Sequence, residues 1–128
     1  MIIIDANVIL RYLLDDVEEM AEEAAEVIEN SGVRVLPEVM AEVVYVLEGV
    51  YDLERKKIKE ILAKFIQLNT VLINKEKAVQ EALDKYGASN LDFVDCLLYG
   101  YSQNGKQEVF TFDQKLTREI KESNNDGE

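Results

Sequence analysis

The sequence has 128 residues, 48% of them hydrophobic and 31% charged, and this composition predicts one soluble globular domain. It contains no histidine and a single cysteine, Cys96, which excludes Ser-His-Asp and Cys-His triads, histidine-ligated metal sites and an internal disulfide. Its 26 acidic residues against 14 basic ones give a net charge of −12, which argues against a large basic surface for nucleic acid and leaves carboxylates as the available chemistry.

Four short runs of β-branched and aromatic residues predict strands, in the chain order 2–4, 34–36, 71–73 and 109–112. Apolar residues at helical spacing predict helices around 17–28, from Pro37 onward, and around 58–68, 78–86, 91–103 and 114–122. Strands that alternate with helices indicate an α/β fold with a central parallel sheet flanked by helices on both faces. The first run has no polar alternation, so we expect it to be a central, fully buried strand.

The chain contains no linker or repeat, so we expect one domain over residues 1–122. The tail, residues 123–128, has nothing apolar to bury and is predicted to be disordered and acidic. No basic leader precedes the first acid, and no apolar run approaches the roughly 18 residues that cross a bilayer. We therefore expect a cytoplasmic protein without a membrane partner.

Two aspartates directly follow predicted strands, Asp5 after the first strand and Asp113 after the last. Open parallel sheets bind ligands beyond the carboxyl ends of their strands, so both carboxylates would reach one crevice if the two strands are neighbours. Each aspartate could instead only cap the helix that follows it. The sequence leaves these two interpretations about equal.

Two further acids have apolar neighbours at helical spacing. Glu42 lies between Val39 and Val46, and Asp95 has leucines four residues before it and three after it. A carboxylate on a core-facing stripe is costly unless something pairs with it, which suggests a functional site. A buried ion pair, or a stripe rotated slightly from the one inferred, would explain the same pattern.

Other charged residues favour structural roles. Ser89 and Asp92 match a capping box, and the acids between residues 15 and 29 form a solvated helix face, with Asp15 or Asp16 as its cap. The chain has one local cluster of basic residues, which is either a wet helix surface or a foothold for RNA phosphates: Arg55, Lys56, Lys57, Lys59 and Lys64.

Four segments resemble the PIN domain family, in the order that the family has them. IIDANVIL at residues 3–10 resembles the opening strand that ends in D-x-N or D-x-S, and PEVMAEVVYVL at 37–47 resembles the second element, whose glutamate precedes a hydrophobic run. LDFVDCLL at 91–98 is similar to the third motif, usually F-x-D-A-L, and TFD at 111–113 to the closing T-x-D. The size and arrangement most resemble VapC-type toxins of toxin–antitoxin pairs.

The resemblance implies a metal-dependent endoribonuclease that uses Mg²⁺ or Mn²⁺. It also implies an RNA substrate, a small antitoxin protein as partner, and a homodimer. The residues that it assigns to metal binding and catalysis are Asp5, Glu42, Asp95 and Asp113. In supporting positions it places Asn7 beside the first acid, Thr111 as a hydroxyl at the edge of the site, and Asp92 as an extra acid near the third motif.

Clustered carboxylates explain how such a site works without histidine. Two carboxylates roughly 5 Å apart repel by about 3 kcal/mol at an effective dielectric constant near 20, so the cluster must protonate or recruit cations. Oxygen-only ligands favour Mg²⁺ or Mn²⁺, which activate a water and neutralise the leaving oxygen. We therefore expect products with 5′-phosphate and 3′-hydroxyl ends.

Three alternatives compete with this hypothesis. A catalytically silent PIN-like binding or scaffold module would share the fold without the chemistry. Haloacid-dehalogenase-like phosphotransferases also place an aspartate after a strand, but they use D-x-D where this sequence has Asn7. Receiver domains also place an aspartate after a strand, but they require an acidic pair near the N-terminus and a lysine near the end of the sequence. Neither of the last two explains Glu42 or Asp95.

Overall fold

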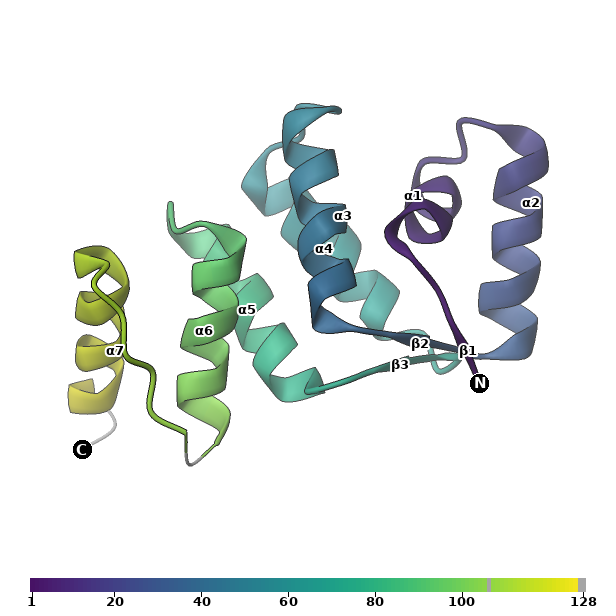
Figure 1. Ribbon diagram of the computed structural model, residues 1–128. Coiled ribbons are helices and arrows are strands. Elements are labelled where there is room, and N and C mark those ends of the chain that lie inside the picture. The colour runs from purple at the N-terminus through teal and green to yellow at the C-terminus, as the bar shows by residue number, and fades with distance from the viewer. Residues whose placement is uncertain (106, 127–128) are drawn as a thin grey trace. The chain divides into compact units, whose positions relative to one another are not determined.

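The computed structural model describes residues 1–105 and 107–126 (Figure 1). The chain forms two compact units, Met1–Glu76 and Lys77–Glu128. The first unit contains the described strands together with the helices that pack around them. The described part of the second unit is helical apart from its connecting segments.

The first unit is built on a small parallel sheet. Its strands are β1 (Ile2–Ile3), β2 (Val33–Val35) and β3 (Val71–Ile73), in the order β1-β2-β3. The register pairs Ile2 with Val33 and Val33 with Val71. The helices of this unit are α1 (Ala6–Leu14), α2 (Glu18–Glu26), α3 (Pro37–Gly49) and α4 (Arg55–Ile66), and a π-helical turn, Val27–Ser31, follows α2.

Local sequence explains where several of these elements begin and end. Pro37 is the first residue of α3, as expected, because a helix does not use the N–H that proline lacks there. Asp15 ends α1 in a left-handed conformation with φ of 51°, and its N–H donates to the carbonyl of Arg11. Gly32 precedes β2 with φ of 76°, a conformation that favours glycine.

The core of the first unit lies around β2 and the inner faces of the helices. Val33 and Val35 of β2 are completely buried, as β-branched residues of a strand paired on both sides commonly are. In Figure 1, α1 and α2 lie side by side next to β1, and α3 contacts both α1 and α4. The expected α/β class with a parallel sheet is confirmed.

The second unit packs helices closely against one another. Its helices are α5 (Glu76–Ala88), α6 (Phe93–Asn104) and α7 (Gln114–Asp126). Gly100 of α6 lies directly against the backbone of Ala78 in α5, so a larger residue would not fit there. The buried rings of Tyr86 and Phe93 contact edge to face with centroids 5.7 Å apart, and Leu116 of α7 is completely buried.

The expected burial of the first strand is wrong. Among the described strands β1 pairs with β2 alone, so it lies at an edge of the sheet. Ile2 and Ile3 are 46% and 62% exposed, and only Ile4, just after the strand, is buried. An unbroken apolar run therefore does not distinguish a central strand from one whose outer edge is open.

The fourth predicted strand is also wrong. Residues 109–112 are not in a strand in the described structure, and Phe110 and Phe112 are 85% and 90% exposed. Their rings contact each other with centroids 5.2 Å apart. High β-propensity expresses how well side chains fit a half-buried pleated surface, and the described part of the second unit contains no strand that supplies one.

Two of the predicted caps are wrong as well. The side chain of Ser89 accepts from the N–H of Leu91 at 3.3 Å and donates to the carbonyl of Lys85 at 2.6 Å, so it closes α5 and forms no capping box. Asp92 occupies the N-cap position of α6 without a side-chain capping bond. The N-cap of α2 is Val17, and neither preceding aspartate caps that helix.

The last helix extends into the predicted tail. Residues 123–126 belong to α7, and the hydroxyl of Ser123 donates to Gln103 Oε1 at 2.7 Å. The boundary predicted after residue 122 therefore falls within this helix. The last part of the predicted tail, residues 127–128, lies outside the described residues. Within the described chain, no helix combines the length and apolar character needed to cross a membrane.

Candidate active site

Asp5 stands at the carboxyl end of β1 and caps α1. Its Oδ1 accepts a hydrogen bond from the N–H of Val8 at 3.1 Å, which satisfies one of the free N–H groups of the first turn. The residue is exposed, and the cap uses one carboxylate oxygen. The capping interpretation is therefore correct, and it leaves the second oxygen available for a ligand.

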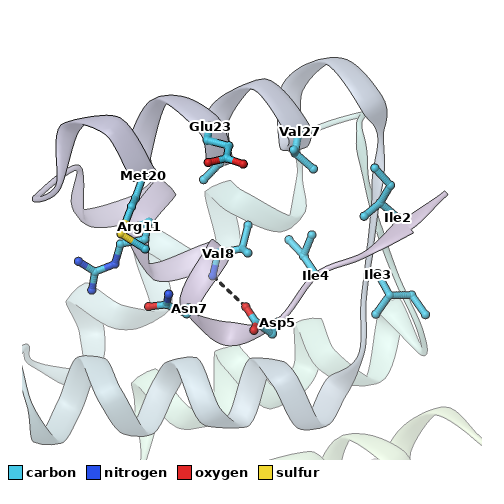
Figure 2. Close-up of a pocket in the computed structure, with 11 residues that line it drawn as sticks. Ile2, Ile3, Ile4, Asp5, Asn7, Val8, Arg11, Met20, Glu23 and Val27 are labelled. Carbon is cyan, nitrogen blue, oxygen red and sulfur yellow. Dashed lines mark hydrogen bonds between the residues drawn. The ribbon is translucent and has the colours of Figure 1, made fainter.

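A cavity of about 460 Å³ lies beside Asp5, between β1, α1 and α2 (Figure 2). Its wall is mainly apolar and includes Ile4 and Val8. Polar groups from α1 and α2 join this wall, and the lining includes Asp5, Asn7, Arg11 and Glu23. The position predicted for Asn7, beside the first acid, is thus a position on the same cavity.

Arg11 is held by a small network at the far end of α1. Its Nη1 donates to Asp16 Oδ1 at 2.6 Å, and Nη2 lies 3.4 Å from the hydroxyl of Tyr51. The hydrogen bond to Tyr51 and the charge of Asp16 raise the pKa of Arg11. This network ties α1 to Asp16 in the turn before α2 and to Tyr51 just after α3, and it holds Arg11 at one side of the cavity.

Glu42 does not lie on the core-facing stripe of α3. Its side chain is exposed, whereas Val43 and Val44 are completely buried. The expected burial of this acid is wrong, and no desolvation argument supports a function for it. Its exposed carboxylate remains able to bind a cation or a water molecule.

Asp95 lies in the first turn of α6 and is half-buried. Burial raises the pKa of Asp95, and the negative charges of Asp113 and Asp92 raise it further. The structure thus brings acidic groups together in the second unit, including two of the four residues assigned to the site. Their mutual repulsion disfavours ionisation of Asp95 in the absence of a cation.

Asp113 repeats in the second unit the arrangement of Asp5. Its Oδ1 accepts from the N–H of Leu116 at 2.8 Å and so caps α7. The hydroxyl of Thr111 accepts from the N–H of Asp113 at 3.0 Å. Thr111, predicted as a supporting hydroxyl, therefore bonds to the backbone of Asp113 and helps to hold this aspartate in place.

The acidic side chains fit a hard divalent cation by their chemistry. Asp5 and Glu42 belong to the first unit, and Asp95 and Asp113 to the second. Within residues 1–105 and 107–126, no group of three or more acidic or cysteine side chains is placed to hold a metal ion. The donors are nevertheless all carboxylate oxygens, which Mg²⁺ and Mn²⁺ prefer, and a cation would relieve the repulsion at Asp95.

The basic cluster lies on α4. Lys56, Lys57 and Lys64 are exposed, whereas Arg55 and Lys59 are half-buried. The opposite face of α4 is apolar and packs into the core of the first unit. The three exposed lysines thus form a solvated basic surface on an otherwise acidic chain.

Two residues of the cavity, Arg11 and Glu23, are not among the site residues predicted from the sequence. Arg11 follows Asn7 by four residues, and this spacing on a helix would have placed both on one face. Glu23 was included in the solvated acidic face, yet it lines the cavity together with Met20 of α2 and Val27 at the start of the π-helical turn. Figure 2 shows these three side chains on the side of α2 next to β1 and α1.

A family model described as PIN domain matches residues 2–121. No curated protein and no solved structure matches the chain. PIN domains are typically nucleases, and such nucleases generally use divalent metal ions. Because the match spans nearly all of the sequence, including every acid assigned to the site, the chain belongs to the PIN domain family.

Proposed function

We propose that this protein is a Mg²⁺- or Mn²⁺-dependent endoribonuclease that acts as the toxin of a VapC-type toxin–antitoxin pair. The observation that carries the proposal is the accumulation of negative charge at Asp95, whose pKa is raised by burial and by the charges of Asp113 and Asp92. Burial and nearby negative charges both disfavour the ionised carboxylate of Asp95, and a cation that binds there would relieve this penalty. Membership in a family of nucleases supports the same function.

We assign the following roles to the residues of the site. Asp5, Asp95 and Asp113 hold the metal ion, and Asn7 keeps a carboxylate or water in position beside Asp5. Glu42, exposed on α3, orients the attacking water or adds a ligand. A bound divalent ion would supply a water of lowered pKa and charge for the leaving oxygen. Exposed lysines of α4 are the proposed contacts for RNA phosphates.

The decisive variant is Asp5→Asn. Asparagine also caps helices, so the fold should persist, while the loss of a charged ligand should lower the cleavage rate by at least about 100-fold. The measurement is cleavage of a structured RNA panel with Mn²⁺ and with a chelator, followed by analysis of the product ends. We expect 5′-phosphate and 3′-hydroxyl ends.

Glu22→Gln is the matched control, because it removes an exposed acid from α2 outside the cavity lining. It should leave cleavage unchanged. Equal activity of Asp5→Asn and wild type would refute the assignment of Asp5. Products that end mainly in 2′,3′-cyclic phosphates would refute the mechanism.

A catalytically silent binding module is the alternative, and one observation favours it: the described residues contain no ready group of three ligands. Titration with Mn²⁺ separates the two functions. Binding that is weakened by Asp5→Asn supports the nuclease, whereas absence of binding together with absence of cleavage supports the silent module.

We also propose an antitoxin protein as partner and a homodimer as the assembly. The net charge of −12 suits a partner that contributes basic residues to the acidic site. A short upstream reading frame whose product has a DNA-binding N-terminus would supply the partner to test. Its product should co-purify with this chain and suppress cleavage, and a protein without such a neighbour would be a housekeeping nuclease.

A further inference from the structure

Lys85 joins the helices of the second unit. Its ammonium group forms a salt bridge with Glu119 of α7, and its Nζ lies 4.6 Å from the centre of the Tyr99 ring of α6. The side chains of Lys85 and Glu119 are 21% and 30% exposed, so most of the pair is withdrawn from water. One side chain of α5 thus contacts both helices that carry acids assigned to the site, and all of these contacts lie within a single unit.

The surroundings of Lys85 favour its charged form. Burial lowers the pKa of Lys85, but the hydrogen bond to Glu119 and the electrostatic effects of Tyr99 and Glu119 outweigh burial and leave the pKa raised. Salt screens a partly buried pair less than an exposed one, and the face of an aromatic ring attracts a cation further. The lysine is therefore charged at neutral pH and attracts α7 toward α5.

The second unit holds α7 by few contacts. Among the residues of α7 whose burial is described, only Leu116 is buried, whereas α5 buries five residues. The far end of α7 is tied to α6 by the hydrogen bond from Ser123 to Gln103. Glu119 lies between these two contacts, so its salt bridge with Lys85 anchors the middle of the helix.

The other two helices of this unit are locked together. A Cβ added at Gly100 of α6 would come within 2.2 Å of the carbonyl oxygen of Ala78 in α5, so the two backbones are already in close contact. Asp95 stands in the first turn of α6, and Asp113 caps α7. A movement of α7 on the α5–α6 pair would therefore change the separation of these two acids.

The two acids themselves oppose the docking of α7. The charge of Asp113 contributes to the raised pKa of Asp95, which means that the two carboxylates are close enough to repel each other. Without a cation, this repulsion pushes the start of α7 away from α6. Glu119 follows Asp113 by six positions, about 9 Å along a helix, so the salt bridge acts on α7 close to the carboxylate that is repelled.

We propose that Lys85 is a positioning residue, whose salt bridge with Glu119 holds α7 on the α5–α6 pair and so keeps Asp113 near enough to Asp95 for one divalent cation to bind both. Lys85 contacts neither metal nor RNA in this role and acts through α7. The metal-binding role of the two acids rests on the proposed function, whereas the docking of α7 by Lys85 does not.

Spin labels on the two helices test the docking in the metal-free chain. Val94→Cys and Gln114→Cys place one label beside each acid at exposed positions, and Cys96 is buried, so it should not take up the label. Electron paramagnetic resonance measures the distance between the labels, and we expect a narrow distribution. Lys85→Met keeps a long side chain without its charge, and it should broaden the distribution and lengthen the mean distance.

Three further variants isolate the salt bridge. Lys85→Glu combined with Glu119→Lys exchanges the two charges and should restore most of the narrow distribution. Glu119→Gln should broaden it, and this variant tests the same pair even if Lys85→Met does not fold. Lys77→Met is the control, because it removes an exposed lysine of α5 with the same change in net charge and should have no effect. An unchanged distribution in Glu119→Gln, or equal broadening in Lys77→Met, would overturn the proposal.

Titration with Mn²⁺ tests the consequence for the metal site. Lys85→Met and Glu119→Gln should weaken Mn²⁺ binding by about 10–100-fold, as changes beyond the direct ligands commonly do, and the exchanged pair should regain most of the affinity. A purely structural role would lower the unfolding temperature of these variants and leave the Mn²⁺ affinity of the folded protein unchanged. That result would overturn the positioning role.

If the wild-type protein binds no Mn²⁺ and cleaves no RNA, the proposed function fails, and the spin-label distances still decide whether Lys85 docks α7.

Discussion

Residues 2–4 and 109–112 are alike in sequence and differ in structure. Both are apolar and rich in β-propensity, and both precede an aspartate that caps the following helix. The first segment hydrogen-bonds to β2, whereas the second forms no strand and leaves two phenylalanines in solvent. The first unit supplies residues 2–3 with a partner strand, whereas the described part of the second unit contains no strand to pair with residues 109–112.

The two units that contain these segments also build their cores differently. The first unit surrounds β2 with helices, and its most buried residues include Val33 and Val35. The described part of the second unit has no sheet and depends on close approach of helix backbones, such as Gly100 against Ala78. Substitutions should therefore affect the two units through different mechanisms.

The largest effect should come from Gly100→Ala. The added Cβ would overlap the carbonyl group of Ala78, and backbone cannot move aside as a flexible side chain can. We expect a loss of at least about 3 kcal/mol in the free energy of unfolding, at the upper end of overpacking effects. Urea denaturation followed by circular dichroism measures it.

Gly49→Ala is the control in the first unit. A Cβ at Gly49 would meet nothing within 4 Å, and alanine is the better helix former by about 0.5–1 kcal/mol. We therefore expect equal or higher stability for Gly49→Ala. Similar losses for both glycines would contradict the view that the second unit depends on this close helix contact.

The next effect compares the two strand-like segments directly. Ile4 is 4% exposed, so Ile4→Ala should lower the free energy of unfolding by about 2–5 kcal/mol. Phe112 is 90% exposed, so Phe112→Ala should change it by less than about 0.5 kcal/mol in the isolated chain. Thermal and urea unfolding at low protein concentration measure both changes.

The unfolding measurements on Phe112→Ala become more specific when they are repeated at several protein concentrations. A loss for Phe112→Ala that grows with concentration would show that the ring is buried in an assembly of several chains. A large loss that is independent of concentration would mean that the segment belongs to the core of the single chain. The difference inferred here between buried Ile4 and exposed Phe112 would then be disproved.

The helices of this fold could be predicted from local sequence. Pro37 begins α3 as expected, and the apolar stripes on α4 and α5 are buried as their spacing indicates. Asp5 and Asp113 could be identified as helix caps from their positions alone, and both bond to the first turn of the following helix. These features depend on neighbours within about four residues along the chain.

The wrong predictions about residues 2–4 and 109–112 concern burial and strand pairing, which depend on residues far away in the sequence. Whether Ile2 and Ile3 are buried depends on what lies beyond β1, and whether residues 109–112 form a strand depends on a distant partner. The predicted burial of Glu42 is wrong for a different reason. The residues that α3 buries include Met40, Val43 and Leu47, which recur at three- and four-residue spacing, and Glu42 lies off this stripe. Both stripes fit a helix, so the spacing alone did not decide between them.

A smaller effect should come from the two caps. Asp113→Ala removes the acceptor for the N–H of Leu116, and Asp5→Ala removes that for the N–H of Val8, at a cost of about 1 kcal/mol each. Asp113→Asn and Asp5→Asn should keep most of this stability. Unfolding curves of the four variants measure the contributions, and unequal losses would show that one aspartate has further partners.

The smallest effect should come from Asp95→Asn, and its sign is opposite to that of the destabilising variants above. Burial and the charges of Asp113 and Asp92 raise the pKa of Asp95, so the folded state disfavours the ionised carboxyl. Near pH 3, below the ordinary pKa of about 3.9, the carboxyl is protonated in both states and the penalty is absent.

As pH rises through the raised pKa, the folded state of the wild type loses stability that the neutral asparagine keeps. In the presence of a chelator, Asp95→Asn should therefore be more stable than wild type at pH 7 and nearly equal to it near pH 3. Glu22→Gln, which removes one exposed charge elsewhere on the chain, controls for the change in net charge.

If Asp95→Asn is less stable than wild type at pH 7, then Asp95 stabilises the fold, and the observation on which the metal site rests is removed. A gain in stability that disappears when Mn²⁺ is added would instead locate the cation at Asp95, because a bound ion stabilises only the folded wild type.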